Sequence, residues 1–240
     1  MTRERLLKTQ LADLIKNVSD NNPHVTLVIV GVAANILELI GGHPSIERNL
    51  VQIEMPVMSA DEISEIVEKG CYHLHISLDP DVLTELALLA DGFPHYAHLL
   101  GLAIARACYT TNKLHMDRST FDQLACSLAI EDAVDTFRRK FASATLTTRV
   151  SRYPQILCAC AWAEATEHGV FRASSVVEAF SAMFEEEVKM QAVVRALGEF
   201  TTPERDSVLS KIKVGKNHHY RFTEPMMRPF LRIKAKTLQE

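Results

Sequence analysis

The sequence predicts a mainly helical protein with a small α/β segment near its start and a β-hairpin near its end. Three observations support this prediction. Helical periodicity and helix caps recur along most of the chain. A continuous apolar, β-branched run at 25–31 has the pattern of a strand buried on both faces of a sheet, and residues 50–55 read as a second short strand. Two alternating runs, 207–213 and 219–222, flank a turn containing Gly and Asn, as in a hairpin.

The composition is that of a soluble globular chain. Of the 240 residues, 47% are hydrophobic and 23% are charged, which is enough for more than one core. No apolar run reaches the roughly 18–20 residues of a membrane span, and the charged start, Met1 to Arg5, does not resemble a signal peptide. We therefore expect a cytoplasmic protein without a membrane partner.

Cysteine and histidine spacing predicts neither a disulfide framework nor a metal site. The five cysteines include no C-x-x-C pair and lie among apolar helical residues, which favours buried free thiols. The ten histidines include no H-x-x-x-H or H-E-x-x-H pattern. We therefore expect no metal ligands.

The first 56 residues read as helix, strand, helix, strand. A helical stripe runs over 3–19, and the strand predicted at 25–31 is followed by a short helix over 34–40 and by the strand at 50–55. Two strands cannot make a stable sheet covered on both faces. Either another chain supplies further strands, or residues 1–56 are the end of a longer α/β domain.

Residues 57–129 read as a small helical subdomain. Ser59 and Glu62 form a capping box that begins its first helix, which we expect to run to Lys69 and to stop at Gly70. The other expected boundaries are a start at Asp79-Pro80 with an end at Gly92, a helix over 93–110, and a cap at Asp117.

A single connector helix is expected over 130–145, within a connecting segment 130–150, because acidic residues near its start and basic residues near its end suit the helix dipole. The last segment, 151–240, contains predicted helices over 152–167, 172–186 and 189–201 and then the hairpin. Three helices followed by a hairpin make a winged-helix module.

Charge is distributed unevenly along the chain. The net charge is −4, which argues against general nucleic-acid binding. Residues 203–240, however, hold nine Lys and Arg against four Asp and Glu, so this end carries +5 and the rest −9. The sequence therefore predicts a basic module on an acidic body.

Several short stretches, in this order, carry a family resemblance. The stretches are Gly31-Val32-Ala33, Ser45-Ile46-Glu47-Arg48, Met55-Pro56-Val57-Met58-Ser59-Ala60-Asp61-Glu62 and Gly92-Phe93-Pro94-His95-Tyr96. With them the chain resembles the second half of an AAA+ ATPase, closest to bacterial ATP-binding proteins of the origin-recognition and STAND-like branches. The likeness covers nearly the whole chain, with the helical block as the lid and the C-terminus as the winged helix.

The resemblance implies three nucleotide-site residues. Arg48 corresponds to the arginine finger, which reaches the γ-phosphate bound by a neighbouring subunit; the alternative is an ion pair with Glu47 or Glu54. Asn35 corresponds to the sensor that orients water, or else it only begins the helix. His95 stands where the lid sensor is usually an arginine, so either it contacts phosphate when protonated or its role is structural.

The motifs that bind nucleotide are missing. The chain has no Walker A sequence and no apolar strand ending in Asp-Glu, which is the Walker B motif. The full-length family binds ATP and Mg²⁺, but we expect this chain alone neither to bind ATP tightly nor to hydrolyse it. The chain looks cut just after these motifs, and whether Met1 is the natural start stays open. Unpaired strand edges would favour homo-oligomers.

Two functions stay open at this level. In the first, the chain is part of an AAA+ ATPase that acts as a nucleotide-dependent regulatory or DNA-associated switch. The helix over 189–201 has few polar groups for reading bases, whereas the hairpin offers basic side chains to DNA phosphates. In the second, the same architecture is a non-enzymatic adaptor for a protein partner. The nucleic-acid candidates are Lys211, Lys213, Lys216, His218 and Arg221.

Overall fold

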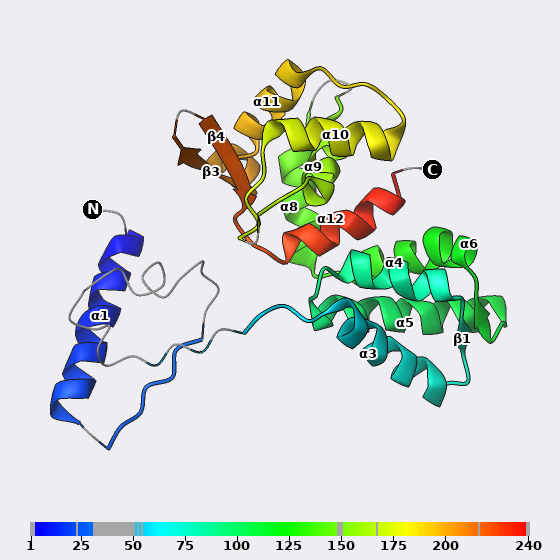
Figure 1. Ribbon diagram of the computed structural model, residues 1–240, viewed down its shortest axis with the longest axis horizontal. Coiled ribbons are helices and arrows are strands. Elements are labelled where there is room, and N and C mark those ends of the chain that lie inside the picture. Colours follow the sequence, from blue (N-terminus) through cyan, green and yellow to red (C-terminus); the bar gives the residue numbers. More distant parts are fainter. Residues whose placement is uncertain are drawn as a thin grey trace. The chain divides into compact units, whose positions relative to one another are not determined.

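The computed structural model describes residues 3–22, 24–30, 51, 53, 55–147, 151–166, 168–215 and 217–238. The chain divides into two compact units, Met1–Pro56 and Val57–Glu240. The described part is mainly helical and contains two small two-stranded sheets (Figure 1). None of the described helices combines the length and the apolar character that crossing a membrane requires.

The first unit contains one described helix, α1 (Arg3–Asn21), where a helix over 3–19 was predicted. Ala12 and Ile15 are buried, whereas Leu14 is half exposed. Ile15 of the predicted stripe is therefore on the buried face of α1, together with the partly buried Leu11 and Val18, whereas Leu14 is not.

The two strands predicted for this unit are wrong wherever the structure describes them. Residues 25–30, 51, 53 and 55 adopt no strand. Val30, which belongs to the strand predicted to be buried, is 90% exposed, and Ile53 is 81% exposed. A strand is stable only beside a neighbour that pairs with its backbone N–H and C=O groups. No described residue of this unit forms such a ladder. The short helix predicted over 34–40 lies outside the described residues.

The second unit begins with a helical group over residues 57–132. Its helices are α3 (Ala60–His73), α4 (Pro80–Ala90), α5 (Pro94–Thr111), α6 (Arg118–Thr120), the π-helical turn η2 (Phe121–Ala125) and α7 (Cys126–Asp132). A two-residue parallel pair, β1 (Ser77–Leu78) and β2 (His115–Met116), ties the end of α3 to the end of α5. The helices enclose an apolar core that includes Leu86, Leu100 and Ile104.

The predicted boundaries of this group hold at its caps and fail at one glycine. Asp79 and Asp117 are N-caps, and the Asp117 carboxylate accepts the backbone N–H of Thr120 at 2.9 Å. Helix α3, however, continues through Gly70 to His73, so the predicted stop is wrong. An exposed glycine costs a helix only about 1 kcal/mol, and Cys71, buried one residue later, keeps the last turn on the core.

The capping box at the start of α3 gives a pH-dependent prediction. The Glu62 backbone N–H donates to the Ser59 hydroxyl, and the Glu62 carboxylate accepts the Ser59 N–H at 2.8 Å. These hydrogen bonds from Ser59 lower the pKa of Glu62 from its ordinary 4.5. The stabilisation is therefore present above pH 4.5 and is lost as the pH falls through the lower, folded-state pKa.

We expect Glu62→Ala to lower the free energy of unfolding at neutral pH and to match the wild type below the folded-state pKa. Urea denaturation at a series of pH values measures the difference. Glu68→Ala, which removes a carboxylate from the same helix, is the control. A difference between Glu62→Ala and wild type that does not change with pH would contradict the assignment.

The connector helix predicted over 130–145 is two helices. Helix α7 ends at Asp132, and α8 (Asp135–Thr145) starts after an extended Ala133 with φ −60° and ψ 152°. Ala133, at the break, and Phe137, in the first turn of α8, are both buried.

Residues 151–222 form three helices and an antiparallel hairpin, in the predicted order. The helices are α9 (Tyr153–Trp162), α10 (Ala173–Phe184) and α11 (Met190–Glu199), the 3₁₀ turn η3 spans Pro203–Arg205, and the strands are β3 (Leu209–Val214) and β4 (Asn217–Phe222). Phe171 pairs with Tyr220, so the segment between α9 and α10 lies along the free edge of β4. Rings of Phe171, Tyr220 and Phe222 pack together beneath the hairpin.

A final helix, α12 (Met227–Lys236), was not predicted. It packs against α9, α7 and α4, and Figure 1 shows it in red between the helices of residues 57–132 and those of residues 151–199. Phe230 and Ile233 are buried on one face. The Tyr96 hydroxyl, from α5, donates to the Met226 carbonyl at 2.8 Å, just before α12 begins. This helix therefore joins the two helical groups into one unit.

Candidate functional site

The outer end of the hairpin carries three of the predicted nucleic-acid residues on one face. Lys213 pairs with His218 across the strands, and Lys211 pairs with Tyr220. Because directly opposed residues share a face and residues two apart repeat it, Lys211, Lys213 and His218 lie on one side. All three are exposed. Tyr220, nearer the base of the hairpin, is buried. On this face the base of the hairpin therefore packs on the core, and the part toward the turn presents basic side chains to solvent.

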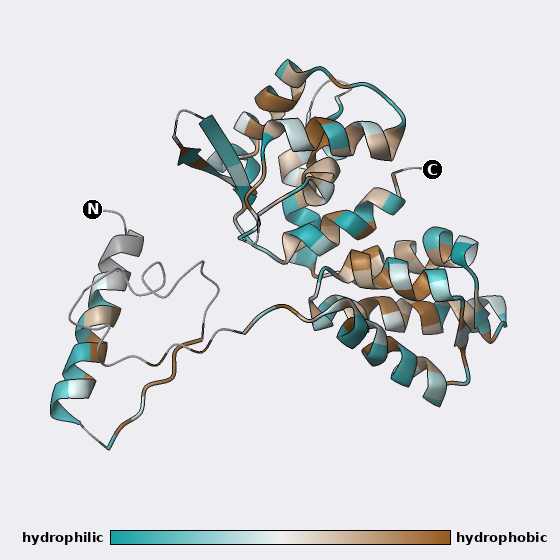
Figure 2. Cartoon of the chain, in the orientation of Figure 1, coloured by the Kyte–Doolittle hydropathy of each residue, from teal (hydrophilic) through white to brown (hydrophobic). Residues whose placement is uncertain are grey.

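Arg221 lies on the opposite face of the hairpin. It pairs with Ser210 and shares its face with His219, which is buried at 9% exposure. The Arg172 guanidinium Nε donates to His219 Nε2 at 3.1 Å. Figure 2 shows β4 in the hydrophilic colour along most of its length. The structure thus divides the predicted set between two faces of one hairpin and adds Arg172, which sequence reasoning missed because it lies 47 residues before its partner.

The remaining predicted site residues are not gathered at this hairpin. Lys216, Asn35 and Arg48 lie outside the described residues. His95 is exposed in the first turn of α5, where its ring meets the edge of the Tyr96 ring at 5.2 Å. No described contact links His95 to the hairpin.

Helix α11 presents a sparsely polar outer face. Gln191, Val194 and Arg195 are exposed, three and four residues apart, while Val193 and Leu197 are buried behind them. Two polar side chains can contact base edges, but they form a small set for reading a sequence. This arrangement agrees with the sequence prediction that the hairpin is the main cationic element.

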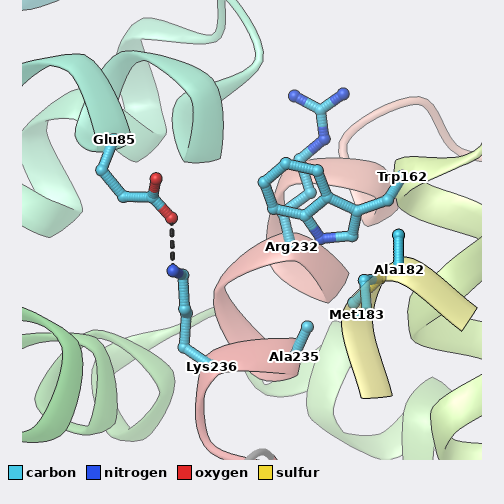
Figure 3. Close-up of a pocket in the computed structure, with 7 residues that line it drawn as sticks. All are labelled: Glu85, Trp162, Ala182, Met183, Arg232, Ala235 and Lys236. Carbon is cyan, nitrogen blue, oxygen red and sulfur yellow. Dashed lines mark ion pairs between the residues drawn. The ribbon is translucent and has the colours of Figure 1, made fainter. Parts of the chain in front are cut away.

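Three of the four basic residues of α12 form ion pairs with acidic residues of the preceding helical group, which corrects the interpretation of the C-terminal charge. Lys236 Nζ lies 2.5 Å from Glu85 Oε1 (Figure 3) and 3.4 Å from Asp122. Arg228 and Arg232 lie 3.4 Å and 3.0 Å from Asp91. Three of the nine cations counted in residues 203–240 are therefore largely covered and hold α12 to the helices of residues 57–132.

Burial controls the protonation of this ion-pair cluster. It lowers the pKa of Arg232 to about 10, against the favourable charge of Asp91. Burial also raises the pKa of Asp91, and the guanidinium groups of Arg232 and Arg228 oppose that rise. Because a pKa of about 10 is still well above neutral pH, Arg232 stays charged there, although its side chain is only 11% exposed and has lost most of its hydration.

A second polar cluster was not foreseen from the sequence. Ser77 Oγ lies 2.9 Å from His115 Nδ1, and His115 Nε2 lies 3.3 Å from Asp79 Oδ1. The three side chains follow the order of a nucleophile, a base and an acid. The Ser77 hydroxyl, however, also donates to the Leu114 carbonyl. The three residues lie at the exposed β1–β2 pair. The cluster therefore ties β1 to β2.

The part of the chain that the structure describes contains neither a metal-binding group nor an accessible thiol. No group of three His, Cys, Asp or Glu side chains there is placed to hold a metal ion. All five cysteines are buried and free, and burial raises the pKa of the Cys126 and Cys158 thiols to about 12. These thiols are therefore core side chains that stay protonated.

No protein-family model, curated protein or solved structure that was compared with the chain matches it.

Proposed function

We propose that residues 151–240 form a winged-helix module that binds the phosphate backbone of double-stranded DNA, mainly through its hairpin. The observation that supports this most is the cationic outer face of the hairpin, where Lys211, Lys213 and His218 extend beyond the packed core. Residues 207–223 contain no acidic side chain. The nearest acidic residue after β4, Glu224, forms an ion pair with Lys140.

The hairpin is a narrow element with cations on both faces, and this arrangement suits an element that lies beside a phosphate backbone. Lys211 and Lys213 lie on one face, and Arg172 and Arg221 on the other. Cations on both faces can contact the phosphates on either side of a groove, and such contacts are weakly sequence-dependent and sensitive to salt. Gln191 and Arg195 on α11 would add a small number of base or phosphate contacts.

The test is fluorescence anisotropy of a labelled duplex of about 25 base pairs at low salt. We expect Lys211→Glu/Lys213→Glu to weaken binding at least tenfold, because each reversal replaces a phosphate contact by repulsion. We expect Lys211→Gln/Lys213→Gln to reduce the slope of log K against log salt by about 2. Lys69→Glu/Lys113→Glu reverses two exposed lysines elsewhere and should weaken binding much less.

Equal affinity of the wild type and Lys211→Glu/Lys213→Glu for the duplex would reject DNA binding through the hairpin. That result would favour the other function proposed from the sequence, a non-enzymatic adaptor for a protein partner.

The proposal that the whole chain is the C-terminal portion of an AAA+ ATPase rests on the family resemblance of its motifs and on the order of its helices. In that proposal the helices of residues 57–132 form the lid, Arg48 acts on nucleotide held by a neighbouring subunit, and ATP with Mg²⁺ controls DNA binding. Homo-oligomers are then the active form. Asn35 and His95 keep their proposed sensor roles.

For the 240-residue chain alone we expect no magnesium-dependent ATP turnover, because the Walker A and Walker B motifs are missing from the sequence. Release of phosphate from ATP, with and without Mg²⁺, measures it. Heat-denatured protein at the same concentration is the control. Turnover above that control, proportional to protein concentration, would contradict the proposal.

A further inference from the structure

The register of the β1–β2 pair places three polar side chains on one face. Ser77 stands opposite His115 in this parallel pair. Asp79 follows Ser77 by two positions in extended backbone, so it repeats the same side of the chain. The alternate residues Ile76 and Met116 are buried, so their side is the core side. The backbone fixes this arrangement, because the Asp79 N–H donates to the Met116 carbonyl at 3.1 Å.

The contacts between these side chains suit a base that activates a nucleophile. Ser77 Oγ lies 2.9 Å from His115 Nδ1 and 3.2 Å from the Leu114 carbonyl, so the imidazole is the nearer acceptor for its hydroxyl. When the hydroxyl donates to Nδ1, Nε2 carries the proton of the neutral ring and faces Asp79 Oδ1 at 3.3 Å. This tautomer makes His115 a general base for Ser77.

Asp79 is an N-cap that does not cap its helix. An N-cap carboxylate usually accepts a backbone N–H of the first turn, and Asp117 does so with Thr120 at 2.9 Å. Asp79 makes no such hydrogen bond with α4, and its carboxylate lies beside His115 instead. Local rules of this kind are broken mainly at functional sites. The start of α4 is thereby left without a side-chain cap, and backbone N–H groups at a helix start stabilise negative charge.

We propose that Ser77, His115 and Asp79 form a hydrolytic site for esters. Ser77 Oγ attacks the acyl carbon while its proton passes to His115 Nδ1, and the bond to the leaving alcohol then breaks as His115 returns the proton to that alcohol. Water attacks the acyl-serine in the same way through His115. The carboxylic acid leaves, and Ser77 takes back its proton. Asp79 is a positioning residue that holds the His115 tautomer.

The surroundings of Ser77 define the class of ester. The side chains of His115 and Asp79 are 52% and 39% exposed, so a small ester reaches them from solvent. Asp79 and the exposed Asp81 make the start of α4 acidic, which disfavours an anionic substrate. The substrate class is therefore a small neutral ester. This activity is independent of DNA binding through the hairpin.

Covalent labelling with diisopropyl fluorophosphate tests whether Ser77 is activated. The serine oxygen bonds to phosphorus, fluoride leaves, and the serine proton passes to the base. Peptide mapping by mass spectrometry gives the rate at each serine of the wild type. We expect Ser77 to react at least about tenfold faster than Ser174, an exposed serine in the first turn of α10.

Variants assign the roles of the two partners. His115→Gln should slow labelling of Ser77 at least about tenfold, whereas His98→Gln, on the exposed face of α5, should not change it. Asp79→Asn keeps a good N-cap residue but removes the charge, and it should slow labelling at least about threefold. Asp79→Glu should restore part of the rate. Circular dichroism checks that each variant is folded.

Turnover is measured with p-nitrophenyl acetate, a small neutral ester. Ser77→Ala should release nitrophenolate at most about one tenth as fast as the wild type. Equal rates for these two proteins, equal labelling of Ser77 and Ser174, or unchanged labelling in His115→Gln would each overturn the proposal. The comparison of Ser77 with Ser174 is made within the wild type, so it decides the question even if a variant does not fold.

Discussion

Replacing Arg232 with alanine is expected to lower the free energy of unfolding of the protein by about 3–5 kcal/mol. Arg232 Nε donates to the Ala161 carbonyl at 3.1 Å, and Nη1 donates to the Leu88 carbonyl at 2.5 Å. The guanidinium also pairs with Asp91 and lies 5.0 Å from the centre of the Trp162 ring. The variant removes these contacts together and leaves a mostly buried carboxylate with Arg228 as its remaining partner.

Urea denaturation followed by circular dichroism measures this loss. Arg232→Lys keeps the charge but lacks the fork that reaches two carbonyls and a carboxylate, so we expect an intermediate value. Arg195→Ala, on the exposed face of α11, should stay within about 0.5 kcal/mol of the wild type. If Arg232→Ala also stayed within that range, α12 would not be held by this ion-pair cluster.

The second large effect is expected at Gly92, which follows α4 with φ +76°. A Cβ there would lie 2.7 Å from the Met58 carbonyl oxygen and 2.7 Å from Val57 Cβ, both closer than a real contact allows. The Gly92 carbonyl also accepts the Met58 N–H at 2.9 Å, so this approach of the two segments is fixed. Gly92→Ala should therefore destabilise the protein by about 2–4 kcal/mol, from backbone strain and the steric clash together.

Gly169→Ala is a matched control, because Gly169 has a similar φ of +71° but no atom within 4 Å of its would-be Cβ. Gly169→Ala should lower the free energy of unfolding by only about 1–2 kcal/mol, which is the cost of holding an alanine in the left-handed backbone conformation. Thermal or urea denaturation of both variants separates strain from clash. Equal losses for the two variants would show that the Val57–Met58 segment moves aside at no cost.

Local chemistry explains the elements that were predicted correctly. The capping box of Ser59 and Glu62, the N-caps at Asp79 and Asp117, and the hairpin of β3 and β4 depend on residues within a few positions of one another. Such features form wherever the sequence places them. The errors have a different origin, since Gly70 and the break at Ala133 follow the core and not the local pattern.

The sequence by itself determined the helix starts capped by Ser59, Asp79 and Asp117, the hairpin and its basic residues, because these depend on neighbours along the chain. Only the tertiary structure decided which cations face solvent. Lys211 and Lys213 stay exposed, whereas Arg232 and Lys236 meet Asp91 and Glu85 across more than 140 residues. It also decided that the buried Gln155 Oε1 and Trp162 Nε1 atoms have no hydrogen-bond partner among the described residues. Ion pairing and burial act through space, so no count of charges along the chain can assign them.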